Sequence, residues 1–280
     1  MTLPLGEKIR IGTSGWSYKD WTGPFYPDGC APKDRLTHYA TRFDCVEVDS
    51  SFYGVPAAKT ILSWAERTPR HFRFALKVPG AVTHGAASSR PVLDKVLRDE
   101  DSVLPAFLEN AALLGDRLGP VVFQFPYFRV GTMEPGDFLG RLEKTLARLP
   151  TGIRYVVELR NKGWIGRRYL DTLGRHDVAA ALIDHPYMPE PGQQLAMGMV
   201  TTDFTYLRLL GDRYAIEKKT TTWEKPVENK TARVARWAEL LREITTHHGA
   251  GKAWVFANNH FSGHSPATGD QLISRLGKLP

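Results

Sequence analysis

Hydrophobic and polar positions follow two alternating patterns along this chain. Short runs rich in β-branched and aromatic residues are separated by segments in which apolar residues recur at helical spacing. The clearest helical segments are 57–67, 138–149 and 230–247; the last carries one apolar stripe that includes Val234, Trp237 and Leu241. The candidate strands are Ile9–Gly15, Cys45–Phe52, Phe72–Val78, Pro120–Phe125, Arg154–Arg160, Val178–Ile183, Thr205–Leu210 and Lys252–Ala257.

Strands that alternate with helices predict a parallel sheet with helical crossovers. Eight such units in 280 residues match a closed barrel better than an open doubly wound sheet. The prediction is one (β/α)8 TIM-barrel domain over residues 1–280, with a pocket at its C-terminal face. Residues 185–203 carry three prolines and no convincing helix, so they are expected to form a long loop at the barrel mouth. Such a loop is either a lid or plain irregular structure.

Polar side chains share one face of the predicted strands. Residues two apart lie on the same face of a strand, as Glu47 and Asp49 do, and the outer face of a barrel strand packs under helices. The polar set therefore points inward, near the strand ends where active sites of this fold lie. Its members are Glu47, Asp49, Lys77, Gln124, Glu158, Arg160, Asp184, Tyr206, Arg208, Asn258, Asn259 and His260.

Two interpretations of this inward set remain open. Ionised groups are costly to bury unpaired, so they either pair with one another or face a solvated pocket. A buried ion-pair network would only set the barrel register, and such networks are weak evidence of stability. A ligand or substrate site is the favoured interpretation.

Composition narrows the class of protein only a little. The net charge of +7 and the pI near 9.4 weakly favour an anionic partner, although solubility alone explains them and the basic residues are scattered. Cys30 and Cys45 lie in no metal-ligand spacing and are expected to be reduced thiols in a cytoplasmic protein. No signal peptide or membrane span is expected.

Several motifs, in consecutive order, resemble the YecE-like family, also called domain of unknown function 72. They are GTSGWSYKDWTGPFYP at 12–27, VEVDSSFYGVP at 46–56, RTPRHFRFALKVPGAVTH at 67–84, LGPVVFQFPY at 118–127, VELRNKGW at 157–164, TTDFTYLRLLG at 201–211 and FANNHFSGHSP at 256–266. The resemblance covers nearly the whole chain. It implies a TIM barrel and names no reaction.

The resemblance also implies a set of recurrent polar residues. They fall on Glu47, Lys77, His84, Gln124, Glu158, Arg160, Arg208, Asn258 and Asn259. This sequence departs from the family pattern at three positions: Asp49 stands where the family usually has asparagine, Asn161 where it often has histidine, and Leu210 where it commonly has another histidine. A proton shuttle through that last histidine is therefore in doubt.

The chemistry expected of the site is acid–base catalysis on a small anion. Glu47 and Glu158, on the second and fifth strands, should face each other, as paired carboxylates do in hydrolases. With Lys77 they are the predicted catalytic residues, for a hydrolase, lyase or isomerase acting on a molecule such as a sugar phosphate. The predicted substrate-binding residues are Trp16, Asp49, Tyr53, Gln124, Arg160, Tyr206, Arg208, Asn258 and Asn259.

Loop residues add a rim and an anion position to this picture. A stacking rim for a sugar or base is expected from Trp16, Tyr18, Trp21, Phe52, Tyr53, Tyr127 and Trp164. The loop 262–265 precedes the last helix, whose free N–H groups favour phosphate. His84 and His264 are expected to be solvated loop residues.

No metal, and no other cofactor, is predicted. The alternative set Glu47, Asp49, Glu158, Asp184 and His260 would suit Mg²⁺ or Mn²⁺ in a nuclease-like barrel, although nucleic acid is the less favoured partner. A non-catalytic binding protein, with its carboxylates held in salt bridges, is a further alternative, and so is a structural protein with a filled pocket.

Overall fold

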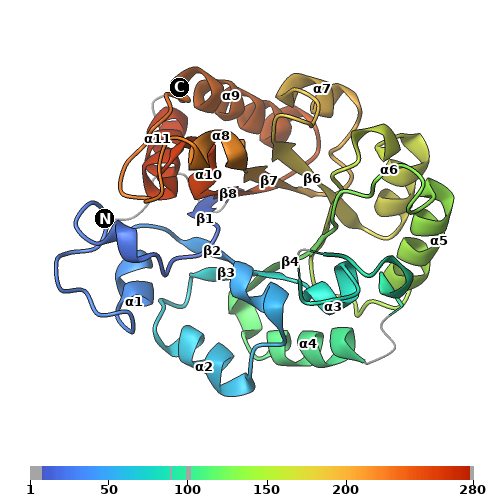
Figure 1. Ribbon diagram of the computed structural model, residues 1–280, viewed down its shortest axis with the longest axis horizontal. Helices are drawn as coiled ribbons and strands as arrows, with labels where there is room; N and C mark the ends of the chain where they lie inside the picture. Colours follow the sequence, from blue (N-terminus) through green and yellow to red (C-terminus); the bar gives the residue numbers. More distant parts are fainter. Residues whose placement is uncertain (1–7, 89, 99–101, 278–280) are drawn as a thin grey trace.

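Eight parallel strands form a nearly closed barrel in the computed structural model, which describes residues 8–88, 90–98 and 102–277 (Figure 1). The strands pair in the order β1-β8-β7-β6-β5-β4-β3-β2. Their bounds are β1 Ile9–Thr13, β2 Cys45–Val48, β3 Arg73–Lys77, β4 Leu118–Gln124, β5 Tyr155–Glu158, β6 Val178–Asp184, β7 Phe204–Leu209 and β8 Lys252–Ala257. The predicted TIM barrel is confirmed.

The barrel closes between β1 and β2 just beyond the end of β1. Ser14 forms an isolated parallel bridge with Glu47, and the Gly15 amide donates to the Glu47 carbonyl at 2.8 Å. This close approach depends on Gly12, because a Cβ there would lie 2.1 Å from the Cys45 carbonyl oxygen. The first and second strands therefore meet directly under the mouth.

Helices surround the strands on the outside (Figure 1). Their bounds are α1 Arg35–Tyr39, α2 Ala58–Glu66, α3 Gly80–Thr83, α4 Val103–Ala112, α5 Pro135–Leu146, α6 Arg167–Arg175, α7 Pro191–Ala196, α8 Arg213–Glu217, α9 Thr231–His247, α10 Asn259–Ser262 and α11 Ser265–Gly277. Short 3-10 helices include Asp49–Tyr53 after β2 and Lys162–Trp164 after β5. Across the part of the chain described, no helix combines the length and the apolarity that crossing a bilayer requires.

The expected helices at 57–67, 138–149 and 230–247 are present with small shifts of their ends. The segment 185–203 departs from the expectation, because it contains α7 where no convincing helix was predicted. A capping box between Glu190 and Gln193 starts this helix, and Pro191 lies in its first turn. The Gln194 amide then donates to the Ile183 carbonyl at 2.8 Å and ties the helix to β6.

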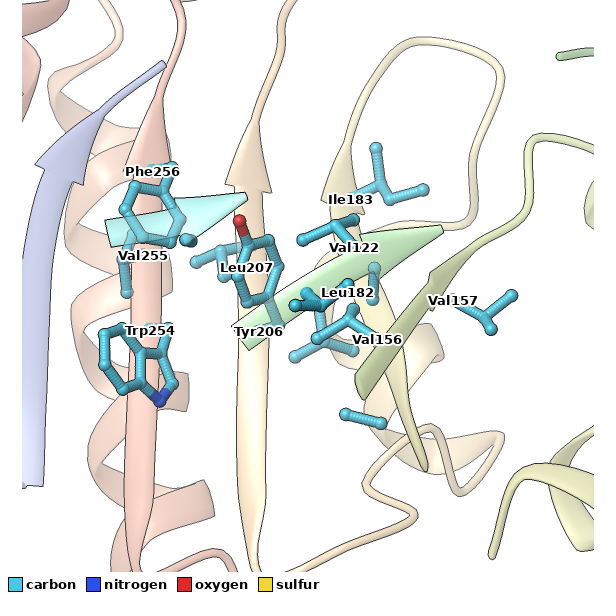
Figure 2. Packing of buried hydrophobic residues seen from close by; sticks show 14 of the residues in the cluster. Val122, Val156, Val157, Leu182, Ile183, Tyr206, Leu207, Trp254, Val255 and Phe256 are labelled. Carbon is cyan, nitrogen blue, oxygen red and sulfur yellow. The ribbon is translucent and has the colours of Figure 1, made fainter. Parts of the chain in front are cut away.

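Apolar side chains fill the barrel below the mouth and the space under the helices (Figure 2). Tyr206 of β7 and Phe256 of β8 lie side by side, with ring centroids 5.1 Å apart. Residues two further along these strands, such as Arg208, share the same inward face. The polar side chains therefore lie above the packed apolar interior, at the C-terminal end of the barrel.

Candidate functional site

Arg208 is the centre of a buried ion-pair network at the mouth. Its side chain is 3% exposed, and both Glu47 and Glu158 are fully buried. Nη2 lies 2.6 Å from Glu47 Oε1, and Nη1 lies 2.5 Å from Glu158 Oε2. One guanidinium from β7 therefore joins the two carboxylates of β2 and β5, which the sequence predicted to face each other.

The Glu47 carboxylate accepts three hydrogen bonds. Besides Arg208, the Ser14 hydroxyl donates to Oε1 at 2.8 Å and the Tyr206 hydroxyl donates to Oε2 at 2.6 Å. Burial and the neighbouring Glu47 charge raise the pKa of Tyr206, so its phenol keeps its proton and stays a donor. Ser14 was not among the predicted residues. It lies two residues after Gly12 and so shares its face of the first predicted strand, and this alternation could have indicated it.

Glu158 is held as a carboxylate. Arg160 Nε donates to its Oε1 at 2.7 Å, while Arg208 holds the other oxygen. Burial alone would raise the pKa of Glu158, but the two guanidinium groups outweigh it and lower that pKa to about 2. Glu158 thus carries no proton to donate near neutral pH.

Asp49 and Lys77 form the outer part of the network. Lys77 Nζ lies 3.3 Å from Asp49 Oδ1 and 5.1 Å from the centre of the Phe52 ring. Arg208 Nη2 lies 3.8 Å from the same Asp49 oxygen. Asp49 opens a 3-10 helix instead of continuing β2, yet it stays on the side of Glu47 as parity predicted.

Two histidines near the cations have a lowered pKa. Burial, helped by the charges of Lys77 and Arg160, lowers the pKa of His84 to about 4. Burial and the charge of Arg160 also lower the pKa of His185. The expectation that His84 is solvated is wrong, because its ring is buried edge-on against Phe52 at 4.8 Å and its Nδ1 lies 2.9 Å from the Thr83 hydroxyl.

The remaining predicted binding residues lie outside this network. Gln124 neighbours Glu158 in the sheet, and its amide donates to the Phe125 carbonyl at 2.9 Å. Asn258 caps α10 by accepting from the His260 amide at 3.0 Å. Asn259 is buried and accepts from the Ser265 amide at 3.0 Å.

Two predicted aromatic residues differ in their surroundings. Trp16 packs edge-on against Trp64 at 5.7 Å, outside the mouth network. Tyr53 is 71% exposed. Of the predicted stacking rim, Tyr53 and Tyr127 are exposed, whereas Trp21 and Phe52 are buried, and Trp16, Tyr18 and Trp164 pack partly against the core.

The predicted phosphate position before α11 is closed. Val227 donates its amide to the Ser262 carbonyl at 2.7 Å, and residues 262–265 are buried beneath that segment. The first amide of the helix, that of Ser265, already donates its hydrogen bond to the Asn259 side chain. His264, also expected in solvent, is buried here with its Nδ1 2.7 Å from the Trp223 carbonyl.

The alternative metal set is not assembled in the described residues. The expectation that Asp184 points inward is wrong: it lies on the outer face of β6, where it accepts from Trp237 Nε1 at 2.5 Å and from Arg233 Nε at 2.7 Å. His260 instead pairs with Glu217 at 3.2 Å. Within residues 8–88, 90–98 and 102–277, no three histidine, cysteine, aspartate or glutamate side chains are grouped so that they could hold a metal ion.

Comparison with known sequences places this architecture in a family. The family model described as "Protein of unknown function DUF72" matches residues 10–280. The UPF0759 protein YunF of Bacillus subtilis is 23% identical over 286 residues, which cover 96% of this chain and 94% of that protein. The UPF0759 protein YecE of Escherichia coli K12 is 31% identical over 153 residues, 55% of this chain and 48% of that protein.

Solved structures show the same fold. A DUF72 family protein from Thermotoga maritima superposes with a TM-score of 0.69 at 22% identity, covering 97% of this chain and all of that one. A DUF72 family protein from Enterococcus faecalis gives a TM-score of 0.70 at 21% identity, covering 98% of this chain and all of that one. Their similarity supports the barrel and carries no assignment of activity.

Proposed function

Because the chain belongs to the DUF72 family, whose function is unknown, we propose a function from the chemistry of its own barrel mouth: it binds a small anionic molecule between Arg160 and Lys77. Three carboxylates and three cations meet there, so the balance of formal charges does not by itself favour an anion. The preference comes from hydrogen-bonding capacity.

Spare donors at the mouth carry this proposal. The oxygens of Glu47 and Glu158 are already occupied by Ser14, Tyr206 and the two guanidinium groups. Arg160 uses only Nε, so both of its Nη groups have no partner among the described residues, and its side chain is 28% exposed. The Lys77 ammonium has three N–H donors, and among the described residues it forms one ion pair, with Asp49, besides its contact with the Phe52 ring. Among the described residues, Asp49 Oδ2 is the one carboxylate oxygen of this network without a partner, and the unused N–H donors of Arg160 and Lys77 outnumber it. Such an excess of donors selects a ligand that supplies acceptor oxygens, such as a phosphate or carboxylate.

The chemistry we propose at this anion is acid–base transfer with altered roles for the predicted catalytic residues. Glu158 stays ionised and anchors the two guanidinium groups, so it does not serve as the proton donor. Lys77 is then the available acid. His84, neutral and next to Lys77, offers its Nε2 as a hydrogen-bonding group to the bound molecule.

A non-catalytic binding protein is the second candidate. It is favoured by the engagement of both glutamates on one guanidinium, which leaves neither of them free to act as a general base. Phosphorus NMR of each bound sugar phosphate separates the two candidates. Conversion that stops in Lys77→Met but persists in Asp34→Asn, a surface change away from the network, supports the enzyme.

Calorimetric titration with sugar phosphates and their neutral parent sugars tests the anion site itself. We expect the phosphorylated members to bind and the neutral ones not to bind. Arg160→Gln should weaken binding by about 10- to 100-fold, because a hydrogen bond to a charged group contributes about 1.5–3 kcal/mol. Arg175→Gln removes the same charge from the far end of α6 and should leave affinity unchanged. Equal affinity for charged and neutral members, or none for either, would refute the proposal.

A further inference from the structure

Exposed apolar side chains gather at one end of the barrel. Among the described residues, the large hydrophobic side chains that are at least 60% exposed are Tyr53, Tyr127, Val130, Tyr187 and Tyr214. Each lies on a segment that follows the carboxyl end of a strand, namely β2, β4, β6 or β7. The carboxyl ends of parallel strands meet at one face of a barrel. These side chains therefore stand around the mouth that holds Arg160 and Lys77.

On one side of the mouth, tyrosines and cations alternate. The strands β2, β3, β4 and β5 are consecutive neighbours in the sheet. These strands, or the segments that follow them, supply in turn Tyr53, Lys77, Tyr127 and Arg160. Each spare cationic donor consequently has an exposed ring on the segment that follows an adjoining strand.

Tyr53 is coupled to Lys77 through one buried ring. The Phe52 ring lies edge-on to Tyr53 with centroids 5.3 Å apart, and it lies 5.1 Å from Lys77 Nζ. Phe52 is buried, so it fixes both neighbours. Tyr53 and the ammonium group of Lys77 therefore contact the same buried ring.

Tyr127 is coupled to Arg160 through Asn161. The Asn161 side chain accepts from the Phe128 amide at 2.9 Å and donates to the Phe128 carbonyl at 2.8 Å. The Phe128 ring stacks on Trp164 at 5.3 Å with an interplanar angle of 6° and fills the buried position of this loop. Tyr127 is left 60% exposed on a loop clamped to the residue that follows Arg160.

We infer that the bound anion carries a sugar or base ring, which stacks on Tyr53 and Tyr127 while its phosphate or carboxylate lies on Arg160 and Lys77. This inference rests on the anion site proposed above. Tyrosine supplies a large, rigid stacking face with few rotatable bonds, which suits a ring ligand. Each exposed ring follows a strand next to one that supplies a cation, which favours a molecule that offers both chemical groups together.

Calorimetry with inorganic phosphate, ribose 5-phosphate and adenosine monophosphate measures the contribution of the ring. We expect at least one ring-bearing phosphate to bind about tenfold or more tightly than phosphate, on the scale of aromatic stacking. A gain with ribose 5-phosphate identifies sugar stacking, and a gain that needs adenosine monophosphate identifies base stacking. Both support the inference.

Variants of the two tyrosines make the test specific. Tyr53→Ala with Tyr127→Ala should abolish the gain and leave phosphate affinity within about twofold. The double phenylalanine variant should keep the gain. Leu113→Ala, which trims an exposed apolar side chain just past the end of α4, should change nothing.

The outcomes separate this inference from the proposed function. If phosphate binds but the ring adds nothing, or if the double alanine variant keeps the gain, the ring inference is overturned and the anion site stands. If no phosphorylated compound binds, both are overturned. If the alanine variants change the oligomeric state and leave ring affinity unchanged, the tyrosines form a protein interface and the inference is overturned.

Discussion

Replacing Arg208 by methionine should be among the most damaging single changes at the mouth. The substitution keeps the apolar part of the side chain but removes the guanidinium between Glu47 and Glu158, both of which are fully buried. Breaking one buried ion pair costs about 3–5 kcal/mol, because the remaining charge stays uncompensated. Two carboxylates lose their partner here, although Arg160 still holds Glu158. We therefore expect Arg208→Met to lower the free energy of unfolding by about 4 kcal/mol or more at pH 7.

Urea denaturation followed by tryptophan fluorescence measures this loss. The matched control is the triple variant that adds Glu47→Gln and Glu158→Gln, which removes the uncompensated charges. It should recover at least half of the loss, since replacing a whole buried pair by neutral groups is often close to harmless. The deficit of the single variant should also shrink as the pH falls toward about 5, because buried carboxylates without a cation take up protons more readily.

A small loss would refute this reasoning. If Arg208→Met lowers the free energy of unfolding by less than about 1 kcal/mol, the network is not buried and paired as described. If the triple variant is no more stable than the single variant, the loss comes from packing and not from unpaired charge. The sequence led us to expect Arg208 to bind the anion directly. With both Nη groups engaged, we now expect its loss to affect stability and the loss of Arg160 to affect binding.

Two further changes test the acid range and the closure of the barrel. The pKa of Glu158 falls from 4.5 to about 2 on folding, so the ionised carboxylate stabilises the fold fully above pH 4.5, and this stabilisation is lost as the pH drops toward 2. In Glu158→Gln, the free energy of unfolding measured by acid titration should not show this loss. Gly12→Ala should lower the free energy of unfolding by about 2 kcal/mol or more, because the new Cβ would meet the Cys45 carbonyl oxygen. The control Gly140→Ala places its Cβ in open space on α5, so it should leave the thermal unfolding temperature unchanged or raise it slightly.

Local patterns in the sequence were enough to predict the barrel and the inward polar face. Alternation along a strand is a property of the extended backbone. It predicts that Glu47, Glu158, Tyr206 and Arg208 lie on the inner face of their strands without reference to any contact between strands. Helical periodicity likewise located α2, α5 and α9 within a few residues. Neither inference depends on how distant segments meet.

The partners of these polar residues were decided by the tertiary structure. Parity cannot tell that Arg208 reaches Glu47, which lies 161 positions away in the sequence, because that contact depends on the register of every intervening strand. Nor can it tell for every strand which of two alternating faces is the inner one: Asp184, the last residue of β6, pairs with Leu209 and faces Trp237 of α9 outside the barrel. Burial of His84 depends on Phe52 folding back over β3, so a loop histidine that looked solvated became a neutral group beside two cations. Backbone periodicity determines which side chains share a face of a strand. Which face lies inside, and the charge state and partners of each side chain, arise only when segments far apart in the chain are packed together.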